Sequence, residues 1–86
     1  TDDELISKEL AFFKVSVENL ENQKAIEKII HANDAKVTYK QEGYMVIEKA
    51  GMEDEIDLLH ELLRQFGVTE FVRTGRIAIL KDKVSI

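Results

Sequence analysis

The two histidines offer the widest choice of chemistry in this chain, because an imidazole transfers protons near neutral pH and also binds metal ions. His31 follows Glu27 by four residues, and His60 follows Asp57 by three. A metal site needs several converging ligands, and the sequence has neither an HxxxH nor an HExxH spacing. A hydrolase would need a cleft that brings one histidine beside carboxylates. We therefore interpret both histidines as surface residues of helices.

Other routes to catalysis or cofactor binding find no support in the sequence. Ser16 and Thr38 have no histidine close by, although a hydroxyl nucleophile needs an adjacent base. The four glycines are dispersed, whereas phosphate-binding loops cluster them. The absence of cysteine excludes disulfides, thiol catalysis and zinc–thiolate sites. We expect no catalytic, cofactor-binding or metal-binding residue in this chain.

Composition limits the class of protein. The chain has 86 residues, with 12 Lys and Arg against 17 Asp and Glu, which gives a formal charge of −5. This length supports one domain, and the acidic balance argues against nucleic-acid binding, which needs clustered cations. Apolar runs are too short for a membrane span or a signal sequence, so we expect a cytoplasmic location. The start at Thr1 fits a fragment of a longer chain, and equally a processed one.

Two segments are predicted to be central strands of a sheet, because they are apolar on both faces. Residues 9–17 contain Phe12 and Phe13, and successive side chains of a strand point to opposite sides. Residues 44–47 form a continuous apolar run. Both segments should therefore have neighbours on each edge and bury at least one face.

The two remaining strands are predicted from different signals. Residues 36–40 alternate apolar residues with lysines, which is typical of an edge strand with one half-exposed face. A tight hairpin should follow, with Gly43 available for a positive φ. Residues 68–80 indicate one long strand that is interrupted by a bulge or bend at Gly75.

Two helices separate these strands. Apolar residues recur at helical spacing over residues 22–32, with Asn22 as the expected N-cap and Asn19 as the competing candidate. Residues 33–34 should end this helix, since asparagine tolerates the left-handed conformation of a C-cap. A second helix begins with an acidic turn, which complements the positive helix N-terminus, and ends before Gly67.

The element order is thus β-α-β-β-α-β. Right-handed crossovers and the central hairpin favour an α+β, ferredoxin-like sandwich, in which two helices cover one face of a four-stranded antiparallel sheet. The strand order should be 4-1-3-2. We predict a single domain over residues 9–82, preceded by a linker or disordered N-terminus over 1–8 and followed by a C-terminal tail over 83–86.

The sheet face without helices is predicted to be an interface. Apolar side chains from the two central strands would meet water there, and patches of this kind usually mark association. We expect a symmetric homodimer. The alternative is that these side chains lie scattered at the rim and that the chain is a monomer. The dimer-face candidates are Phe12, Phe13, Tyr44 and Met45.

The most distinctive run of the sequence covers residues 70–81. Its cations, Arg73 and Arg76, flank Thr74 and Gly75, and a pair of exposed cations beside a bulge glycine explains the run without any function. The run also resembles a stretch "E-x-x-R-T-G-x-x-A-x-x-R" in the last strand of the C-terminal domain of acetolactate synthase regulatory (small) subunits. The matching residues are Glu70, Arg73, Thr74, Gly75 and Ala78, while Lys81 replaces the final Arg.

Two further segments carry the same resemblance. Residues 9–15 are similar to the "E-L-x-L-I-K-V" that opens this domain. Ile47 and Glu48, with Gly51, are similar to the "I-E-x-x-G" before its second helix. The resemblance covers residues 9–81 in order and implies an ACT-like variant of the ferredoxin-like fold.

The resemblance implies a non-catalytic role. Such subunits bind the acetolactate synthase catalytic (large) subunit, raise its activity and confer feedback inhibition by a branched-chain amino acid. That amino acid binds the family's N-terminal ACT domain through a glycine-containing loop, whereas residues 18–21 here have no glycine, so we expect no valine site. Thiamine diphosphate, flavin and magnesium belong to the catalytic partner.

Together these observations predict the C-terminal domain of a regulatory subunit that acts in branched-chain amino acid biosynthesis. It should dimerise and should contact or activate the catalytic subunit. The partner-contact candidates are Arg73, Thr74, Gly75 and Arg76. The alternative is a stand-alone ferredoxin-like sensor of a small metabolite such as an amino acid.

Overall fold

The computed structural model describes the backbone of residues 5–75 and 77–80, and the side chains of residues 8–75. The elements follow the predicted order, except that the last strand is divided in two. In chain order they are β1 (Leu5–Ser16), α1 (Leu20–Ala32), β2 (Lys36–Gln41), β3 (Tyr44–Gly51), α2 (Glu53–Leu63), the 3₁₀ turn η2 (Arg64–Phe66), β4 (Val68–Arg73) and β5 (Ile77–Leu80).

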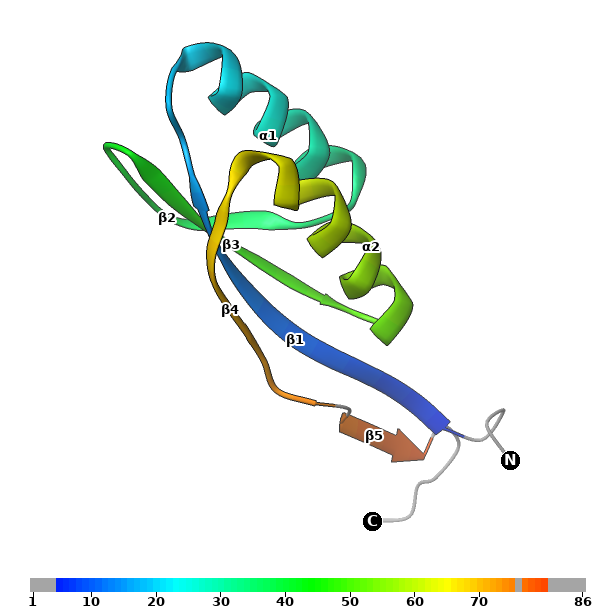
Figure 1. Cartoon of the computed structure of the whole chain (residues 1–86). Helices are drawn as coiled ribbons and strands as arrows, with labels where there is room; N and C mark the ends of the chain where they lie inside the picture. Colours follow the sequence, from blue (N-terminus) through cyan, green and yellow to red (C-terminus); the bar gives the residue numbers. More distant parts are fainter. Residues whose placement is uncertain (1–4, 76, 81–86) are drawn as a thin grey trace.

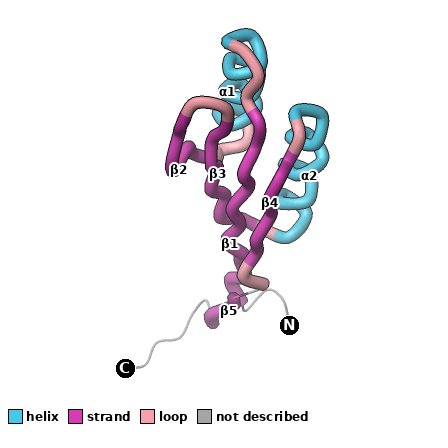
Figure 2. Tube along the Cα trace, turned by 60° about the vertical axis from the view of Figure 1, so that its left-hand side comes forward, coloured by secondary structure: helices cyan, strands magenta, loops and turns pink. Residues whose placement is uncertain are grey.

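The main sheet is antiparallel and has the order β2-β3-β1-β4 (Figure 2). Both α1 and α2 lie on one side of it, and no described helix covers the other side (Figure 1). This arrangement confirms the predicted ferredoxin-like fold, with the two strands that are apolar on both faces at the centre. We call the uncovered side the open face.

The core lies between the sheet and the helices. Along β1, Ala11, Phe13 and Val15 are fully buried, whereas Phe12 points to the open face and is half-buried, as strand alternation requires. The other fully buried apolar side chains are Ile26, Met45, Ile47, Ile56, Leu59 and Leu63.

Two dimer-face candidates were therefore wrong. Phe13 and Met45 each have 0% exposed surface and belong to the core beneath the helices. A strand that is apolar on both faces does not reveal in its sequence which face the helices will cover. Phe12 and Tyr44, from the same two strands, do lie on the open face.

Helix α1 begins two residues earlier than predicted. The side chain of Asn19 accepts a hydrogen bond from the backbone N–H of Asn22 over 2.8 Å, so Asn19 is the N-cap and Asn22 is not. The helix ends with Ala32 and has Asn33 as its C-cap, within the predicted segment 33–34, but the left-handed residue is Asp34, with φ of 54°. Nζ of Lys49, a mostly buried residue of β3, donates to the carbonyl oxygen of Asn33 over 2.8 Å.

Glycines occupy the turns at the predicted positions. Gly43 has φ of 94° in the hairpin between β2 and β3, and Gly67 has φ of 95° after η2. Strand β2 is at the edge, as predicted, but all six of its residues are exposed rather than half of them. It lies at the border of the sheet, where the helices shield it least.

Strand β1 is longer than predicted, because it starts at Leu5 rather than at Glu9. Residues 5–8 pair with β5, and this pairing extends the strand beyond the end of β3 (Figure 1). These residues of the predicted linker are therefore strand. The break between β4 and β5 falls at Gly75, with φ of 82°, as predicted. Residues 1–4 and the predicted tail over 83–86 lie outside the described residues.

Candidate functional site

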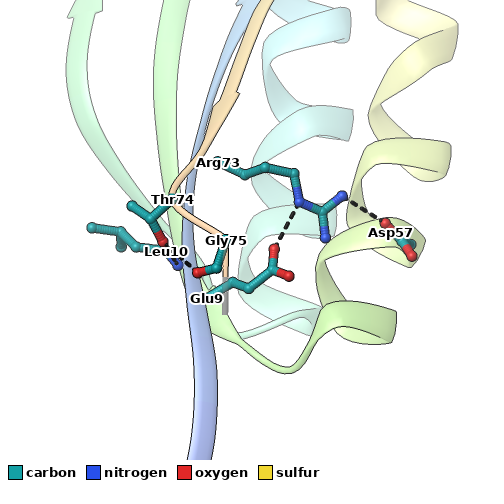
Figure 3. A network of polar contacts seen from close by, with 6 residues as sticks. All are labelled: Glu9, Leu10, Asp57, Arg73, Thr74 and Gly75. Carbon is teal, nitrogen blue, oxygen red and sulfur yellow. Dashed lines mark hydrogen bonds and ion pairs between the residues drawn. The ribbon is translucent and has the colours of Figure 1, made fainter. Parts of the chain in front are cut away.

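The conspicuous arginine of the 70–81 run points into the domain. Arg73 donates from Nε to Oε1 of Glu9 over 2.7 Å, and from Nη1 to Oδ1 of Asp57 over 2.9 Å (Figure 3). Glu9 is a buried residue of β1, and Asp57 is an exposed residue of α2. Arg73 therefore connects the last core strand to the first strand and to the second helix.

This environment keeps Arg73 charged. Hydrogen bonds with Glu9, and then with Asp57, raise the pKa of Arg73 above its already high ordinary value. The guanidinium also lies 5.5 Å from the ring centroid of Phe71, within the range of a cation–π contact. One nitrogen, Nη2, is buried without a hydrogen-bond partner. The other two nitrogens are used inside the domain, so the side chain has little left to offer a partner protein.

An aromatic stack continues from this point. The ring of Phe71 lies 4.3 Å from the ring of His60 and 4.9 Å from that of Phe13, measured between centroids. His60 is consequently half-buried rather than exposed, because a neighbouring strand supplies an aromatic face for it. His31 is exposed on α1, as predicted. The two histidines lie on different helices, and His60 packs on aromatic rings rather than beside a nucleophile.

Thr74, which follows β4 directly, forms two hydrogen bonds with β1. Its backbone N–H donates to the carbonyl oxygen of Leu10 over 2.9 Å, and its Oγ1 accepts from the N–H of Leu10 over 3.1 Å. The same Oγ1 donates to the carbonyl oxygen of Gly75 over 2.9 Å (Figure 3). The positive φ of Gly75 then lets the chain turn from β4 into β5.

The structure thus gives internal roles to three of the four partner-contact candidates, namely Arg73, Thr74 and Gly75. Arg76, the fourth, lies outside the described residues. Sequence reasoning missed Glu9 and Asp57 as the partners of Arg73. One signal was available, since Glu9 and Arg73 carry opposite charges and stand in two separate segments of the same family resemblance.

The open face has an apolar centre. A hollow of about 260 Å³ lies over the middle of the sheet, with an almost wholly hydrocarbon surface. Val72 of β4 has 52% of its surface exposed there. Sequence reasoning missed Val72, because it assigned the face only from the double-sided runs, and from residues 44–47 it chose Met45 rather than Val46. The hollow is lined by Phe12, Lys14, Val46, Glu70 and Val72.

Charged groups border this apolar centre in a defined register. Lys14 stands opposite Glu70 across the β1–β4 pair, and Phe12 stands opposite Val72. Nζ of Lys14 lies 4.5 Å from the ring centroid of Tyr44 on β3, on the other side of β1 from Glu70. Two dimer-face candidates thus lie on one surface: Phe12 is at its apolar centre, and Tyr44 is at its border.

Two larger hollows, of about 540 and 560 Å³, lie elsewhere. The first is formed by the loop between β1 and α1 together with the β2–β3 hairpin, and it includes Glu18, Asn19 and Glu42. Its charged lining is mixed, because it contains Lys40 as well as the two glutamates. Within the described residues, no group of three or more His, Asp or Glu side chains could hold a metal ion. No described helix is long and apolar enough to cross a membrane.

Comparison with known proteins matches this fold and these segments to one family. A solved structure of the acetolactate synthase small subunit from Thermotoga maritima has a TM-score of 0.84, at 24% identity over 95% of this chain and 50% of that one. The acetolactate synthase small subunit of Aquifex aeolicus is 32% identical over 82 residues, which are 95% of this chain and 43% of the relative. The chain therefore spans about half the length of these relatives.

The family described as "Small subunit of acetolactate synthase" has a model that matches residues 8–82, a range that includes Glu9, Arg73, Thr74 and Gly75. The match includes every residue of β1 that pairs within the main sheet, and it continues past β4, so it covers the main sheet and both helices. The chain belongs to the acetolactate synthase small-subunit family, as its C-terminal domain.

Proposed function

We propose that this domain is a non-catalytic regulatory module of a cytoplasmic acetolactate synthase in branched-chain amino acid biosynthesis. It associates with a second copy of itself through the open face, and it contacts and activates the catalytic subunit. The family membership supports the regulatory role. Thiamine diphosphate, flavin and magnesium are assigned to the catalytic partner, and no cofactor is assigned to this chain.

The observation that carries the association is the apolar centre of the open face. Phe12, Val46 and Val72 gather there in the middle of the sheet, and Val72 is half exposed to water. A contiguous apolar surface with a polar border is typical of a protein interface. The helices already cover the opposite face, so a second molecule is what would complete the burial of β1 and β3.

The internal roles of Arg73 and Thr74 support a structural reading of the 70–81 run. Because these residues fix the end of β4, substitution there would alter partner binding only through the shape of the domain. The contact with the catalytic subunit is therefore expected on exposed side chains that are not engaged in these internal hydrogen bonds.

The function is tested by adding the full-length small subunit that contains this domain to its cognate catalytic subunit. We expect the two to co-purify and acetolactate formation to increase. Absence of both co-purification and activation would contradict the proposal. A small-metabolite sensor would instead be indicated by a clear rise in melting temperature of the isolated chain with one amino acid, since a ligand stabilises the state that binds it.

A further inference from the structure

We infer that two copies of this chain pair through β1 and β4 about a twofold axis that runs parallel to these strands, so that Lys14 of each copy faces Glu70 of the other. The inference rests on the proposed function and makes it more specific. It names the strands that meet, the direction of the symmetry axis and the side chains that face each other.

The register of the sheet carries this inference. Lys14 and Glu70 stand side by side at one level along the strands, and Phe12 and Val72 stand side by side at the level two residues earlier in β1. All four line the hollow of the open face. A rotation of 180° about an axis along the strands, placed between β1 and β4, exchanges the two strands and keeps each residue at its level. Phe12 then faces the second copy's Val72, and Lys14 faces its Glu70.

Every contact of this arrangement occurs twice, as a twofold interface requires. The two apolar pairs bury hydrocarbon against hydrocarbon, and the two charged pairs place opposite charges together at the border. Sheets that pack face to face are about 10 Å apart, a separation that a lysine and a glutamate pointing toward each other can span. The surface is thus complementary to itself.

Two alternative twofold axes lack this complementarity. An axis across the strands, midway between the two levels, would exchange the levels and place the carboxylate of Glu70 against Val72, at the cost of burying a charge without a partner. An axis between β1 and β3 would set Phe12 against Glu48, because these residues are opposite in the β1–β3 pair. In both cases an apolar side chain of one copy meets a charge of the other.

The charges are available for such a contact. Within the described residues, Glu70 is exposed and forms no ion pair with its neighbour Lys14, whose Nζ lies over the ring of Tyr44. A lysine side chain can leave a ring at an exposed site at a cost of about 1 kcal/mol or less. Lys14 can therefore turn toward a carboxylate of the second copy.

The experiment exchanges the charges one at a time and then mixes the variants. K14E and E70K are prepared in the 86-residue chain, and association is followed by sedimentation velocity. The wild-type chain should form dimers, and each variant alone should dimerise at least about tenfold more weakly, since like charges then face each other. An equimolar mixture should form heterodimers, because one variant carries two carboxylates at these positions and the other carries two ammonium groups.

Native mass spectrometry with one variant isotopically labelled identifies the heterodimer. Circular dichroism and unfolding midpoints of each variant establish that it is folded, and K28E on the exposed surface of α1 is the matched control, with wild-type association expected. Restored pairing in the mixture cannot come from contacts within one chain. Recovery of dimers by the double variant K14E/E70K would also support the proposed pairing of residues 14 and 70 between copies.

Two results would overturn the inference. One is that both single variants dimerise like the wild type, and the other is that the mixture stays monomeric when both have lost dimerisation. If the small subunit activates the catalytic subunit while the charge variants behave as wild type, only this pairing fails and the proposed function stands. A wild-type chain that is monomeric at every concentration would remove this pairing and the homodimer together.

Discussion

Arg73 and Glu9 are 64 residues apart in the chain, and their side chains are joined by a hydrogen-bonded ion pair of 2.7 Å. The pair lies where β3 ends and β1 continues alone into its pairing with β5. Glu9 is 5% exposed, so its carboxylate has lost most of its contact with water. The ion pair with Arg73 supplies most of the interaction that offsets this desolvation. Arg73 therefore links β4, the last strand of the main sheet, to β1, the first.

Arg73→Met should lower the free energy of unfolding by about 2–4 kcal/mol, because it leaves the buried carboxylate of Glu9 without its partner. Urea denaturation followed by circular dichroism measures this loss. The matched control is Arg64→Met, which removes an exposed ion pair with Glu61 and should cost less than about 0.5 kcal/mol. Equal effects of the two substitutions would show that the Arg73 pair is an ordinary surface pair.

The contribution of Arg73 should not change between about pH 8 and pH 9.5, a range in which the carboxylate of Glu9 stays ionised with or without its partner. Its pKa is raised in the folded state by its hydrogen bonds with Glu9 and Asp57. A raised pKa gives stability that is fully present below the unfolded value and is lost only as the pH rises through the folded value. For an arginine this loss requires strongly alkaline solution. The difference in unfolding free energy between wild type and Arg73→Met, measured at both pH values, should agree within about 0.5 kcal/mol, and a larger drift would contradict this assignment.

Thr74→Val should weaken the attachment of β4 to β1. The substitution keeps the shape of the side chain but removes the oxygen that accepts from the N–H of Leu10 and donates to Gly75, at a cost of about 1 kcal/mol. Hydrogen exchange of the Leu10 amide should become faster. Thr74→Ser retains the hydroxyl and is the matched control, with slow exchange expected. Unchanged protection of Leu10 in the valine variant would argue against this role of the hydroxyl.

Asn19→Ala should destabilise the domain by about 1 kcal/mol, whereas Asn22→Ala should change its stability by only a few tenths. Asn19 accepts the hydrogen bond of the N-cap, and Asn22 contributes only its backbone N–H, which alanine also has. Thermal unfolding of the two variants compares these positions directly. The reverse ranking would mean that α1 starts at the position favoured by the sequence alone.

Much of the fold could be predicted from residue patterns. The double-sided apolar runs around Phe12 and over residues 44–47 indicated central strands, and the lysines of β2 indicated an edge, because burial on a pleated strand follows a period of two. Gly43 and Gly75 marked the turns, since their positive φ values favour glycine. The family resemblance was likewise readable from the segments around Glu9 and Arg73.

The functional surface was predictable only in part. Phe12 and Phe13 are alike in the sequence, and so are Tyr44 and Met45 in their apolar setting, but only one member of each pair lies on the open face. Which side of a double-sided strand is covered depends on where the crossover helices pack, and local sequence does not contain that information. The same holds for His60, which acquired the ring of Phe71 as a neighbour from a distant strand.

The sequence by itself determined the order of elements, the turns and the family, because these depend on short-range periodicity, backbone preference and motif. The tertiary structure decided that Arg73 faces Glu9 and Asp57, and that Phe12, Val46 and Val72 share one exposed surface. Contacts between residues far apart in the chain are fixed by strand register and helix packing. Only the folded chain could therefore separate the side chains that hold the domain together from those that remain available to a second molecule.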